Sequence, residues 1–398
     1  MLIAYKTEIN PTNEQKTKIN RTVGVVRFVE NKYLAHNIEV YENGGSFVGY
    51  MDYSKWLNNT FVPMHPEFSW IKDVYAKAIK RGLQNVHTAF TKFFKGESDF
   101  PQFKKKRNQD VSMYFVKNDA KTIIQVERHR MKVPTLGWVK LKEKGYIPTH
   151  SPSAIVKSGT ISQKADRYFV SVLVEVPDTK SELNLDNEGL GADLGIKETA
   201  IRSDRVTHKN ISKSAKVRKL ERKLKKEQRK LSRKYEAEKL RIKNKEIKKG
   251  EATRRNIQKQ VLKVQRIHYS LTNLRNDFQN KIVADIAKTK PSYVTIEDLN
   301  IKGIMKNKHL SKAVAQQKLY GLRTKLEWKA KQGYFELRMV DRWYPSSKLC
   351  HNCGEKKVDL KLSDRTYQCE HCGYTADRDF NASLNLRDAK EYTVLAPL

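Results

Sequence analysis

The stretch that decides the fold lies near the C-terminus: Cys350-His-Asn-Cys353-Gly354, then Cys369-Glu-His-Cys372-Gly373, then Asp377-Arg-Asp-Phe-Asn-Ala-Ser-Leu-Asn385. The chain has 4 cysteines, and all of them are in this stretch. Two Cys-x2-Cys pairs at this separation are typical of a zinc ribbon, in which four thiolates bind one Zn²⁺ tetrahedrally. We therefore expect one structural zinc ion, with Cys350, Cys353, Cys369 and Cys372 as its ligands.

The residues around the cysteines support a metal knuckle. Gly354 and Gly373 each follow a pair, and glycine permits the tight turn that a knuckle needs. The alternative is two disulfide bonds or a redox pair, which an intracellular compartment disfavours. His351 and His371 lie inside the knuckles, and we expect both at the surface because four thiolates already complete the site.

The charge of the chain indicates a polyanionic partner. The 398 residues include 79 Lys and Arg but only 44 Asp and Glu, which gives a formal net charge of +35. Such an excess repels itself in the folded state unless a polyanion is present. Nucleic acid is the expected partner, and an anionic membrane surface is the alternative. No apolar run approaches the roughly 20 residues of a membrane span, and the first residues contain no signal sequence. We expect a cytoplasmic protein without a membrane partner.

The first half of the chain predicts a helical unit followed by strands. A strand is expected over Leu2–Glu8, and Thr12 with Gln15 matches a helix capping box. Apolar residues at helical spacing and clustered aromatic residues continue to about residue 107. Alternating patterns then predict strands over Thr122–Val126, Val139–Leu141 and Arg167–Val176, which together favour a small antiparallel barrel.

The second half predicts an α/β core with a long basic helical hairpin. Short buried strands are expected at Leu190–Asp193, Ser292–Glu297 and Tyr334–Val340, with a helix over Ala313–Lys331. The residues from Val206 to Val283 are strongly basic and predict two helices separated near Lys249-Gly250. Apolar stripes along both halves predict that these helices pack together, with the cations facing outward.

Three acids lie at the ends of these predicted core elements. Asp193 and Glu297 each end a strand, and Asp379 opens the helix after the cysteines. An acid at the end of a buried strand is destabilising unless it is paired or binds a cation. Three converging acids would bind one or two Mg²⁺ ions. The alternative is that each is a surface residue or a helix cap, as Asp379 could be.

The order of the motifs adds a second line of inference. Gly191–Lys197, Ile296–Asn300 and Asp377–Ala382 occur in this order, and the cysteine pairs lie between the second and the third. The chain resembles the TnpB family of transposon-encoded RNA-guided nucleases, which are relatives of type V CRISPR effectors. Further matching segments extend the resemblance over nearly the whole chain: Tyr5–Gln15, Arg27–Leu34, Phe100–Lys106, Gly137–Lys140 and Tyr344–Cys350. Ala192 and Ser383 depart from the usual residues, but neither is an expected ligand.

The resemblance implies a multidomain α+β fold. A small wedge β-barrel would comprise residues 1–10 and 108–186, with a helical recognition domain, 11–107, inserted in it. An RNase H-like RuvC nuclease domain would comprise 187–344 and 376–398, including the basic hairpin 206–285. The zinc ribbon, 345–375, would bind target nucleic acid as an insertion in the nuclease domain.

The resemblance also implies an activity and its partners. Asp193, Glu297 and Asp379 match the catalytic acids, which bind Mg²⁺, expected as two ions. A guide RNA from the transposon end would select double-stranded DNA, and the protein would read a short flanking motif. The protein would be a prokaryotic monomer within its ribonucleoprotein. The residues expected to contact nucleic acid are Tyr53, Lys77 and Arg81 at the flanking motif, and Lys104, Lys105, Lys106 and Arg107 at phosphates.

Two other functions remain open at this point. Some relatives have lost the acids and bind DNA under RNA guidance without cleaving it. An unguided zinc-ribbon DNA-binding protein that assists transposition is the second alternative. All three acids are present in this chain, which favours an active nuclease over both.

Overall fold

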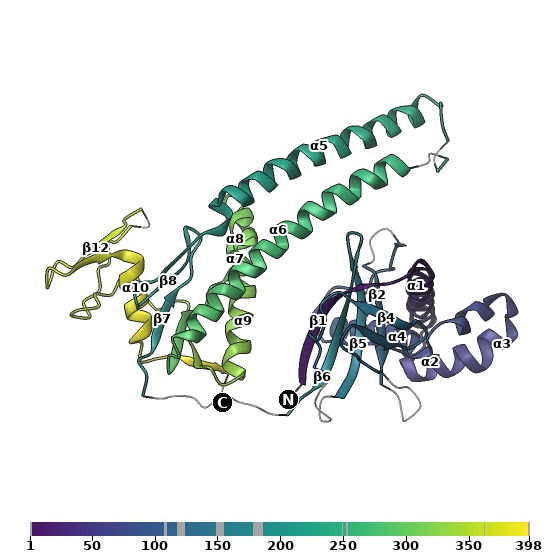
Figure 1. Ribbon diagram of the computed structural model, residues 1–398, viewed down its shortest axis with the longest axis horizontal. Helices are drawn as coiled ribbons and strands as arrows, with labels where there is room; N and C mark the ends of the chain where they lie inside the picture. Colours follow the sequence, from purple (N-terminus) through teal and green to yellow (C-terminus); the bar gives the residue numbers. More distant parts are fainter. Residues whose placement is uncertain are drawn as a thin grey trace. The chain divides into compact units, whose positions relative to one another are not determined.

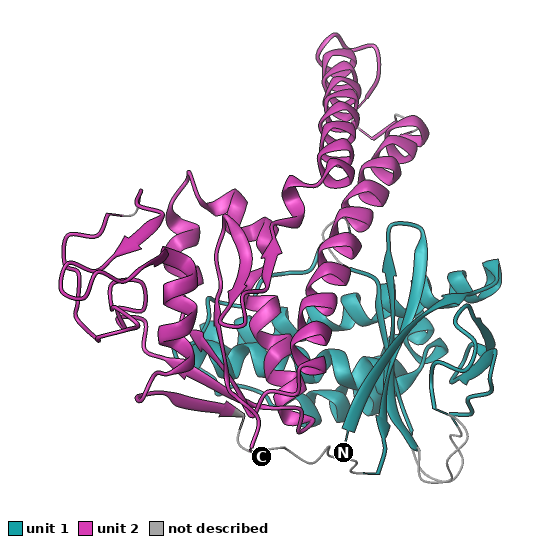
Figure 2. Ribbon diagram, turned by 60° about the vertical axis from the view of Figure 1, so that its left-hand side comes forward, with its two compact units in different colours: residues 1–178 teal, residues 179–398 magenta. Residues whose placement is uncertain are grey.

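The structure is a computed structural model, and it describes residues 2–106, 110–117, 124–148, 155–177, 186–248, 250–251, 254–361 and 363–396 (Figure 1). Arg107, Lys249 and the first two residues of the strand predicted at 122–126 lie outside these ranges. The chain forms two compact units, residues 1–178 and 179–398 (Figure 2).

Unit 1 contains a six-stranded antiparallel sheet in the order β2-β5-β6-β1-β4-β3. The first strand therefore pairs with strands that follow it by more than a hundred residues. The described ends of the sheet, β2 and β3, do not pair with each other, so closure into a barrel remains a prediction. The strands are β1 (Leu2–Asn10), β2 (Ser112–Val116), β3 (Arg130–Val133), β4 (Gly137–Leu141), β5 (Ile155–Lys164) and β6 (Arg167–Glu175).

The chain between β1 and β2 is helical. The capping box is confirmed: the Thr12 hydroxyl accepts from the Gln15 amide at 3.2 Å, and the Gln15 side chain accepts from the Thr12 amide at 3.0 Å. The Gln15 side chain also donates to the carbonyl of Leu136 at 3.0 Å, which ties the start of α1 to the sheet. The helices are α1 (Asn13–Glu42), α2 (Tyr50–Trp56), α3 (Val62–Met64) and α4 (Ala76–Phe94), with a π-helical turn at Leu57–Phe61 and a 3-10 helix at Pro66–Asp73.

Unit 2 is built on a mixed sheet in the order β14-β11-β10-β7-β8-β9. Strands β7, β10 and β11 are parallel, and β8, β9 and β14 run antiparallel to their neighbours. Helices α6 and α9 cover one face of this sheet with apolar side chains, and α10 packs against β7. The strands are β7 (Leu190–Asp193), β8 (Glu198–Arg202), β9 (Thr207–Lys209), β10 (Tyr293–Glu297), β11 (Glu336–Val340) and β14 (Thr393–Ala396).

The basic hairpin consists of α5 (Ala215–Lys243) and α6 (Arg255–Lys288), which lie side by side (Figure 1). Val217 of α5 packs with Ile267 and Leu271 of α6, as the apolar stripes predict. The predicted start at Val206 is wrong, because β9 occupies Thr207–Lys209 as the edge strand of the sheet.

The single helix predicted over Ala313–Lys331 is also wrong. Lys318 is left-handed, with φ 53°, and it separates α8 (Ser311–Gln317) from α9 (Leu319–Lys331). The buried Gln279 side chain donates to the carbonyl oxygens of Gln317 at 2.9 Å and of Lys318 at 2.8 Å. These bonds satisfy carbonyls at the break, which is information that the local sequence does not carry. A short helix, α7 (Ile301–Lys306), precedes this pair.

The C-terminal part of unit 2 holds the two-stranded sheet of β12 (Thr366–Gln368) and β13 (Thr375–Asp377), then α10 (Arg378–Arg387).

None of the described helices is long and apolar enough to cross a membrane. The expectation of a multidomain α+β fold is confirmed at that level. The finer domain boundaries remain predictions.

Candidate active site and metal centre

Two of the predicted acids lie on neighbouring parallel strands. In the β7–β10 pairing, Leu190 is opposite Val294 and Gly191 is opposite Thr295. The same register brings Asp193 opposite Glu297, at the carboxyl ends of both strands. Successive side chains of a strand point to opposite faces. Ala192 and Ile296 point into the apolar core, so Asp193 and Glu297 share the other face of the sheet.

Helix α10 covers that face and brings the third acid to it. Asp379 lies in the first turn of α10. The helix cap is Asp377, whose carboxylate accepts from the amides of Asp379 and Phe380, both at 3.0 Å. The alternative that Asp379 serves as the cap is therefore wrong. Its side chain is 17% exposed, which leaves it available to a site on the β7 face.

The pKa of Asp193 is raised partly by neighbouring acids, which is consistent with their lying close together. Burial, followed by the negative charges of Glu297, Asp379 and Asp377, raises the pKa of Asp193 to about 8, against the opposing charge of Arg378. Burial also raises the pKa of Glu297, against the effect of a hydrogen bond from Ser346. By solvent exposure both acids are only partly buried, and a partly buried acid surrounded by other acids is a typical signature of a functional site.

The acid cluster fits a hard divalent cation. Carboxylate oxygens are the ligands that Mg²⁺ prefers. Among the described residues, no side chain forms a hydrogen bond or ion pair with the Asp193 carboxylate, although the group lies among other acids. A cation there would relieve both the burial and the repulsion of the carboxylates.

Arginine side chains hold Asp379 in this structure. Arg378 donates to one carboxylate oxygen of Asp379 from Nε at 3.0 Å and from Nη2 at 2.7 Å. Arg365 lies 3.7 Å from the other oxygen. Among the residues that the structure describes, the four cysteines are the one group whose ligand atoms converge closely enough to hold a metal ion, and the three acids do not converge in this way. A metal shared by all three acids therefore requires Asp379 to exchange its arginine contacts for the ion.

Ser346 is a site residue that sequence reasoning missed. It follows β11 and donates a short hydrogen bond from its hydroxyl to Glu297 Oε1. The Asn385 side chain of α10 donates to the Ser346 carbonyl at 2.7 Å, so Ser346 links the acid on β10 to α10. The signal in the sequence is that Ser346 lies within Tyr344–Cys350, one of the segments that carry the resemblance, but nothing in that segment indicates a contact with Glu297.

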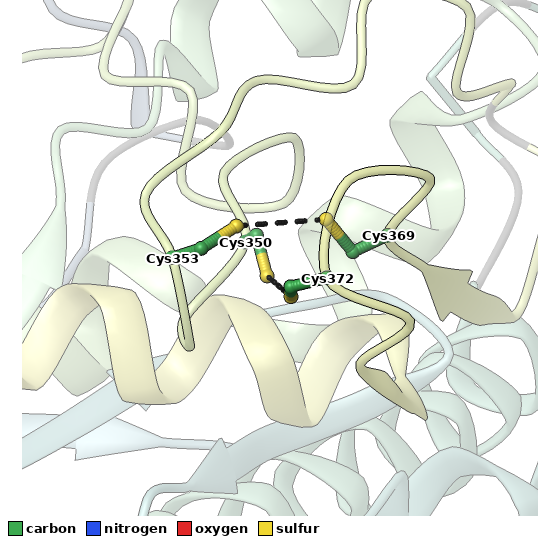
Figure 3. Close-up of side chains that lie close together, drawn as sticks. All are labelled: Cys350, Cys353, Cys369 and Cys372. Atoms are coloured by element: carbon green, nitrogen blue, oxygen red, sulfur yellow. Dashed lines mark hydrogen bonds between the residues drawn. The ribbon is translucent and has the colours of Figure 1, made fainter.

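The four predicted zinc ligands converge (Figure 3). Their sulfur atoms all lie within 4.8 Å of one another, with 3.6 Å between Cys350 and Cys372 and 3.6 Å between Cys353 and Cys369. A tetrahedral zinc–thiolate site with bonds of about 2.3 Å has edges of roughly 3.8 Å. A disulfide bond of about 2.05 Å is excluded at these distances. The cluster is therefore compatible with zinc.

The cysteine cluster is fastened to the helix that carries Asp379. The side chain of Asn381 donates to the Leu349 carbonyl at 2.7 Å, and that of Asn385 donates to the same oxygen at 2.8 Å. Leu349 immediately precedes the first ligand, Cys350. Since residues four apart share a helix face, these asparagines form one clamp on the knuckle. The Asn-x3-Asn spacing was visible in the sequence, but its partner was not.

The three residues predicted at a flanking DNA motif lie in different environments. Arg81 is exposed, and Lys77 is half-buried on the same helix, α4. Arg81 lies over the ring of Tyr114 at 5.4 Å and donates to the Gln84 side chain at 3.0 Å. Tyr53 is only 1% exposed and packs against Tyr33 in the core. In this structure Tyr53 is a core residue, and its contact with DNA stays an untested prediction.

The predicted phosphate-binding cluster is partly engaged within the protein. Lys104 forms an ion pair of 2.6 Å with Glu30, which is 3% exposed. Two hydrogen bonds with the Asn31 side chain also fix the Lys104 backbone, at 2.8 and 2.9 Å. Lys105 and Lys106 are exposed, and Arg107 lies outside the described residues. Only Lys105 and Lys106 therefore offer cations without an observed acidic partner in the described part of the cluster.

Comparison with known proteins places the chain in a family. Three family models match: "Helix-turn-helix domain" over residues 1–46, "Probable transposase" over 170–308, and "Cas12f1-like, TNB domain" over 320–386. A protein of Streptomyces pristinaespiralis is 30% identical over 96% of this chain and 88% of its own length. A protein of Escherichia coli (strain K12) is 27% identical over 99% and 94%. Both are named "Putative RNA-guided DNA endonuclease". The chain belongs to the TnpB family.

A solved structure supports the fold. The cryo-EM structure of a Cas12f1–sgRNA–target DNA complex contains a chain that matches with a TM-score of 0.60 and 12% identity, over 99% of each chain. At this identity the likeness concerns the fold alone. The match named helix-turn-helix covers β1 and the 30-residue helix α1 of this protein.

Proposed function

We propose that this protein is an RNA-guided DNA endonuclease with a single RuvC-type site formed by Asp193, Glu297 and Asp379. The observation that carries the proposal is the placement of Asp193 and Glu297 at the carboxyl ends of the neighbouring parallel strands β7 and β10, with α10, whose first turn holds Asp379, packed against β7. Ligands of open α/β sheets bind at this edge. Membership of the TnpB family supports the activity, because the relatives that match over nearly the whole chain are named as endonucleases of this kind.

The three carboxylates would hold Mg²⁺, expected as two ions. When bound, Mg²⁺ would supply activation of water and stabilisation of the leaving oxygen of a phosphodiester. The chain itself contributes orientation. The parallel strands fix Asp193 and Glu297 side by side, and the Ser346 hydroxyl restrains the Glu297 carboxylate by its hydrogen bond. Arg378 neutralises part of the acid cluster before a cation enters.

We assign the cysteine cluster a structural zinc ion. Four thiolates leave no ligand position open for water, so this ion would not take part in hydrolysis. The hydrogen bonds of Asn381 and Asn385 to Leu349 support a positioning role, because they connect the knuckle to the helix of Asp379. The ribbon would thereby help to place the substrate strand and α10 together.

The partners would be a guide RNA and double-stranded target DNA beside a short flanking motif. The net charge of +35 supports a polyanionic assembly, with affinity that falls steeply as salt rises. Arg81, exposed and adjacent to Tyr114, suits a contact with a base or phosphate. Monomeric assembly and the wedge, recognition and RuvC domain boundaries belong to the same proposal.

The decisive experiment separates guiding from cutting. The full chain is expressed with its flanking transposon sequence, and the co-purified RNA is sequenced. One discrete, abundant RNA species is expected, and its absence would contradict guiding. The complex is then incubated with a matched plasmid in Mg²⁺, beside Asp193→Ala. Cleavage by the native complex alone is expected. Retained binding without any cleavage by the native complex would instead identify a guided DNA-binding regulator.

A further inference from the structure

Trp343 is the most exposed large apolar side chain in the described part of the chain, at 83%. Tryptophan is rarely left in water at this level, because its large apolar surface favours burial. It is instead enriched at interfaces, where the rings gain contact area on binding. The indole of Trp343 forms no hydrogen bond or ring contact with the residues that the structure describes. The exposed indole of Trp343 therefore indicates a binding partner outside the chain.

The position of Trp343 in the fold is next to the candidate active site. Strand β11 ends at Val340, which lies opposite Glu297 in the β10–β11 register. Trp343 follows Val340 by three residues and precedes Ser346, the hydrogen-bond partner of Glu297, by three more. Consecutive Cα atoms are about 3.8 Å apart, so the Cα of Trp343 is at most about 11 Å from either residue.

The loop that carries Trp343 is rigidly attached on both sides of it. The Asp341 carboxylate accepts from the Trp343 amide at 2.8 Å, and the Asp341 carbonyl accepts from the Tyr344 amide at 3.0 Å. Arg342 donates to Asp298, the residue after Glu297, at 2.8 Å. Because the backbone that carries the ring is already held in place, only the side-chain torsions of Trp343 are left to be ordered when a ligand stacks on the ring.

The surroundings of the ring match a single nucleic acid strand. Proteins bind single strands by combining cations that follow the backbone with aromatic rings on which bases stack. Arg342 is adjacent to Trp343 and is 45% exposed, even though it contacts Asp298. Arg365, 48% exposed, lies 3.7 Å from Asp379 and offers a second cation at the same site.

We propose that Trp343 is a stacking platform for a nucleobase of the DNA strand within a few nucleotides of the phosphodiester that is cut. This subsite rests on the proposed nuclease function, since the acids define where the strand must pass. Stacking tolerates any base, because every base has a π-face, so the platform would position the strand without reading its sequence. Trp343 is thus a positioning residue, and the carboxylates remain the catalytic ones.

The test combines Trp343→Ala with single abasic sites moved along the cut strand. The native complex, with its co-purified guide RNA, should lose cleavage rate at one abasic position near the cut, by about 5- to 150-fold. Trp343→Ala should show a similar loss on intact DNA and no further loss at that position. Trp343→Phe should retain most of the rate. Trp328→Ala is the matched control, because Trp328 is also exposed, at 41%, but lies on α9 across the sheet from α10.

A second readout does not depend on cleavage. In the Asp193→Asn complex, 2-aminopurine is placed in turn at each position of the strand near the expected cut. One position should be quenched by stacking, and Trp343→Ala should restore its fluorescence. If the native complex never cuts but this quenching is present, the nuclease assignment fails while the platform stands. Equal abasic penalties in the native and Trp343→Ala complexes, with unchanged 2-aminopurine emission, would overturn the platform. Loss of self-association in Trp343→Ala with normal cleavage would also overturn it, and would assign the ring to a contact between copies.

Discussion

Gly191 of β7 lies directly beneath the backbone of Ser383 in α10. A Cβ atom built at Gly191 would lie 1.9 Å from the Ser383 carbonyl oxygen and 2.5 Å from the amide nitrogen of Arg387. No rearrangement of a flexible side chain can relieve these contacts, because both partners are backbone atoms. The absence of a side chain at Gly191 thus lets the helix of Asp379 approach the strand of Asp193.

Gly191→Ala should therefore displace α10 and separate Asp379 from Asp193. Overpacking of this kind costs about 1–3 kcal/mol of unfolding free energy, and the loss of cleavage should exceed what that destabilisation explains. Thermal unfolding and cleavage rate, measured together, check this. Gly321→Ala on α9 is the control, because its Cβ would meet only ordinary contacts, with Gln279 Oε1 at 3.5 Å and Lys318 Cβ at 3.8 Å. That variant should keep activity and gain about 0.5–1 kcal/mol, the usual benefit of alanine in a helix.

Substitutions of Asp377 and Asp379 should have different effects, because Asp377 caps α10 and Asp379 is the proposed metal ligand. Asp379→Asn keeps the shape of the side chain but removes a ligand charge, so cleavage should fall by about a thousandfold or more, with guided DNA binding intact. Asp377→Ala should instead remove the N-cap of α10 and cost about 1 kcal/mol of stability. Cleavage rates and gel-shift affinities of the two variants decide this. Normal cleavage by Asp379→Asn together with loss of cleavage in Asp377→Ala would mean that Asp377, and not Asp379, is the catalytic acid.

The features of this site that depend on local sequence could be predicted, and those that depend on contacts between residues distant in the sequence could not. The strands of Asp193 and Glu297 were predictable, since each is a short apolar run that ends in an acid. The cysteine spacing predicted the convergence of four sulfur atoms. By contrast, the αL break at Lys318 depends on Gln279, which is distant in the sequence. The contact of Ser346 with Glu297 likewise depends on how β10 and β11 pair.

The sequence also could not predict which aromatic residues of the helical unit are exposed and which are buried, because this too depends on tertiary packing. Tyr53 lies in a segment that mixes aromatic and basic residues, a pattern that suits both a core and a nucleic-acid surface. The structure buries Tyr53 between Tyr33 and Trp56. Among the clustered aromatic residues of the same helical unit, Phe94 is 59% exposed while Phe90 is 3% exposed. Helical spacing fixes which residues share a face, but tertiary packing decides where that face ends.

The stability of unit 2 should depend on pH and Mg²⁺ through Asp193. Its pKa is raised from 3.8 to about 8 in the folded protein, so the folded state binds a proton that the unfolded state has released. The contribution of Asp193 to stability is therefore fully present below about pH 4 and is lost as pH rises toward 8, by roughly 1.4 kcal/mol per pKa unit at most. Without Mg²⁺, Asp193→Asn should become progressively more stable than the native chain across this window.

Saturating Mg²⁺ should reverse that difference, because the ion stabilises the charged carboxylate and the amide cannot replace it. Thermal unfolding of both proteins from pH 5 to 8.5, with Mg²⁺ or with EDTA, measures the effect. Parallel curves for the two proteins at every pH would show that Asp193 is not the buried, metal-binding acid described above.

Removal of the zinc ligand Cys350 should alter the position of Asp379, because the cysteine cluster is hydrogen-bonded to α10. Cys350→Ser should lose the single zinc ion and loosen Leu349, whose carbonyl accepts from Asn381 and Asn385. We expect faster proteolysis within residues 345–375 and a reduced cleavage rate. Metal analysis and limited proteolysis check this. His371→Ala is the matched control within a knuckle, and it should keep one zinc per chain because His371 is not among the clustered ligands.

Ser346 should control the acid limb of the pH–rate profile. Its hydrogen bond lowers the pKa of Glu297, against the burial that raises it. Ser346→Ala therefore raises that pKa further, so a higher pH is needed to ionise Glu297 for metal binding. The acid limb should move to higher pH and the Mg²⁺ requirement should rise, with the rate at high pH and high Mg²⁺ largely recovered. Ser347→Ala is the adjacent control and should leave the profile in place. A uniform loss of rate at every pH in Ser346→Ala would indicate instead that Ser346 acts only by anchoring α10 through Asn385.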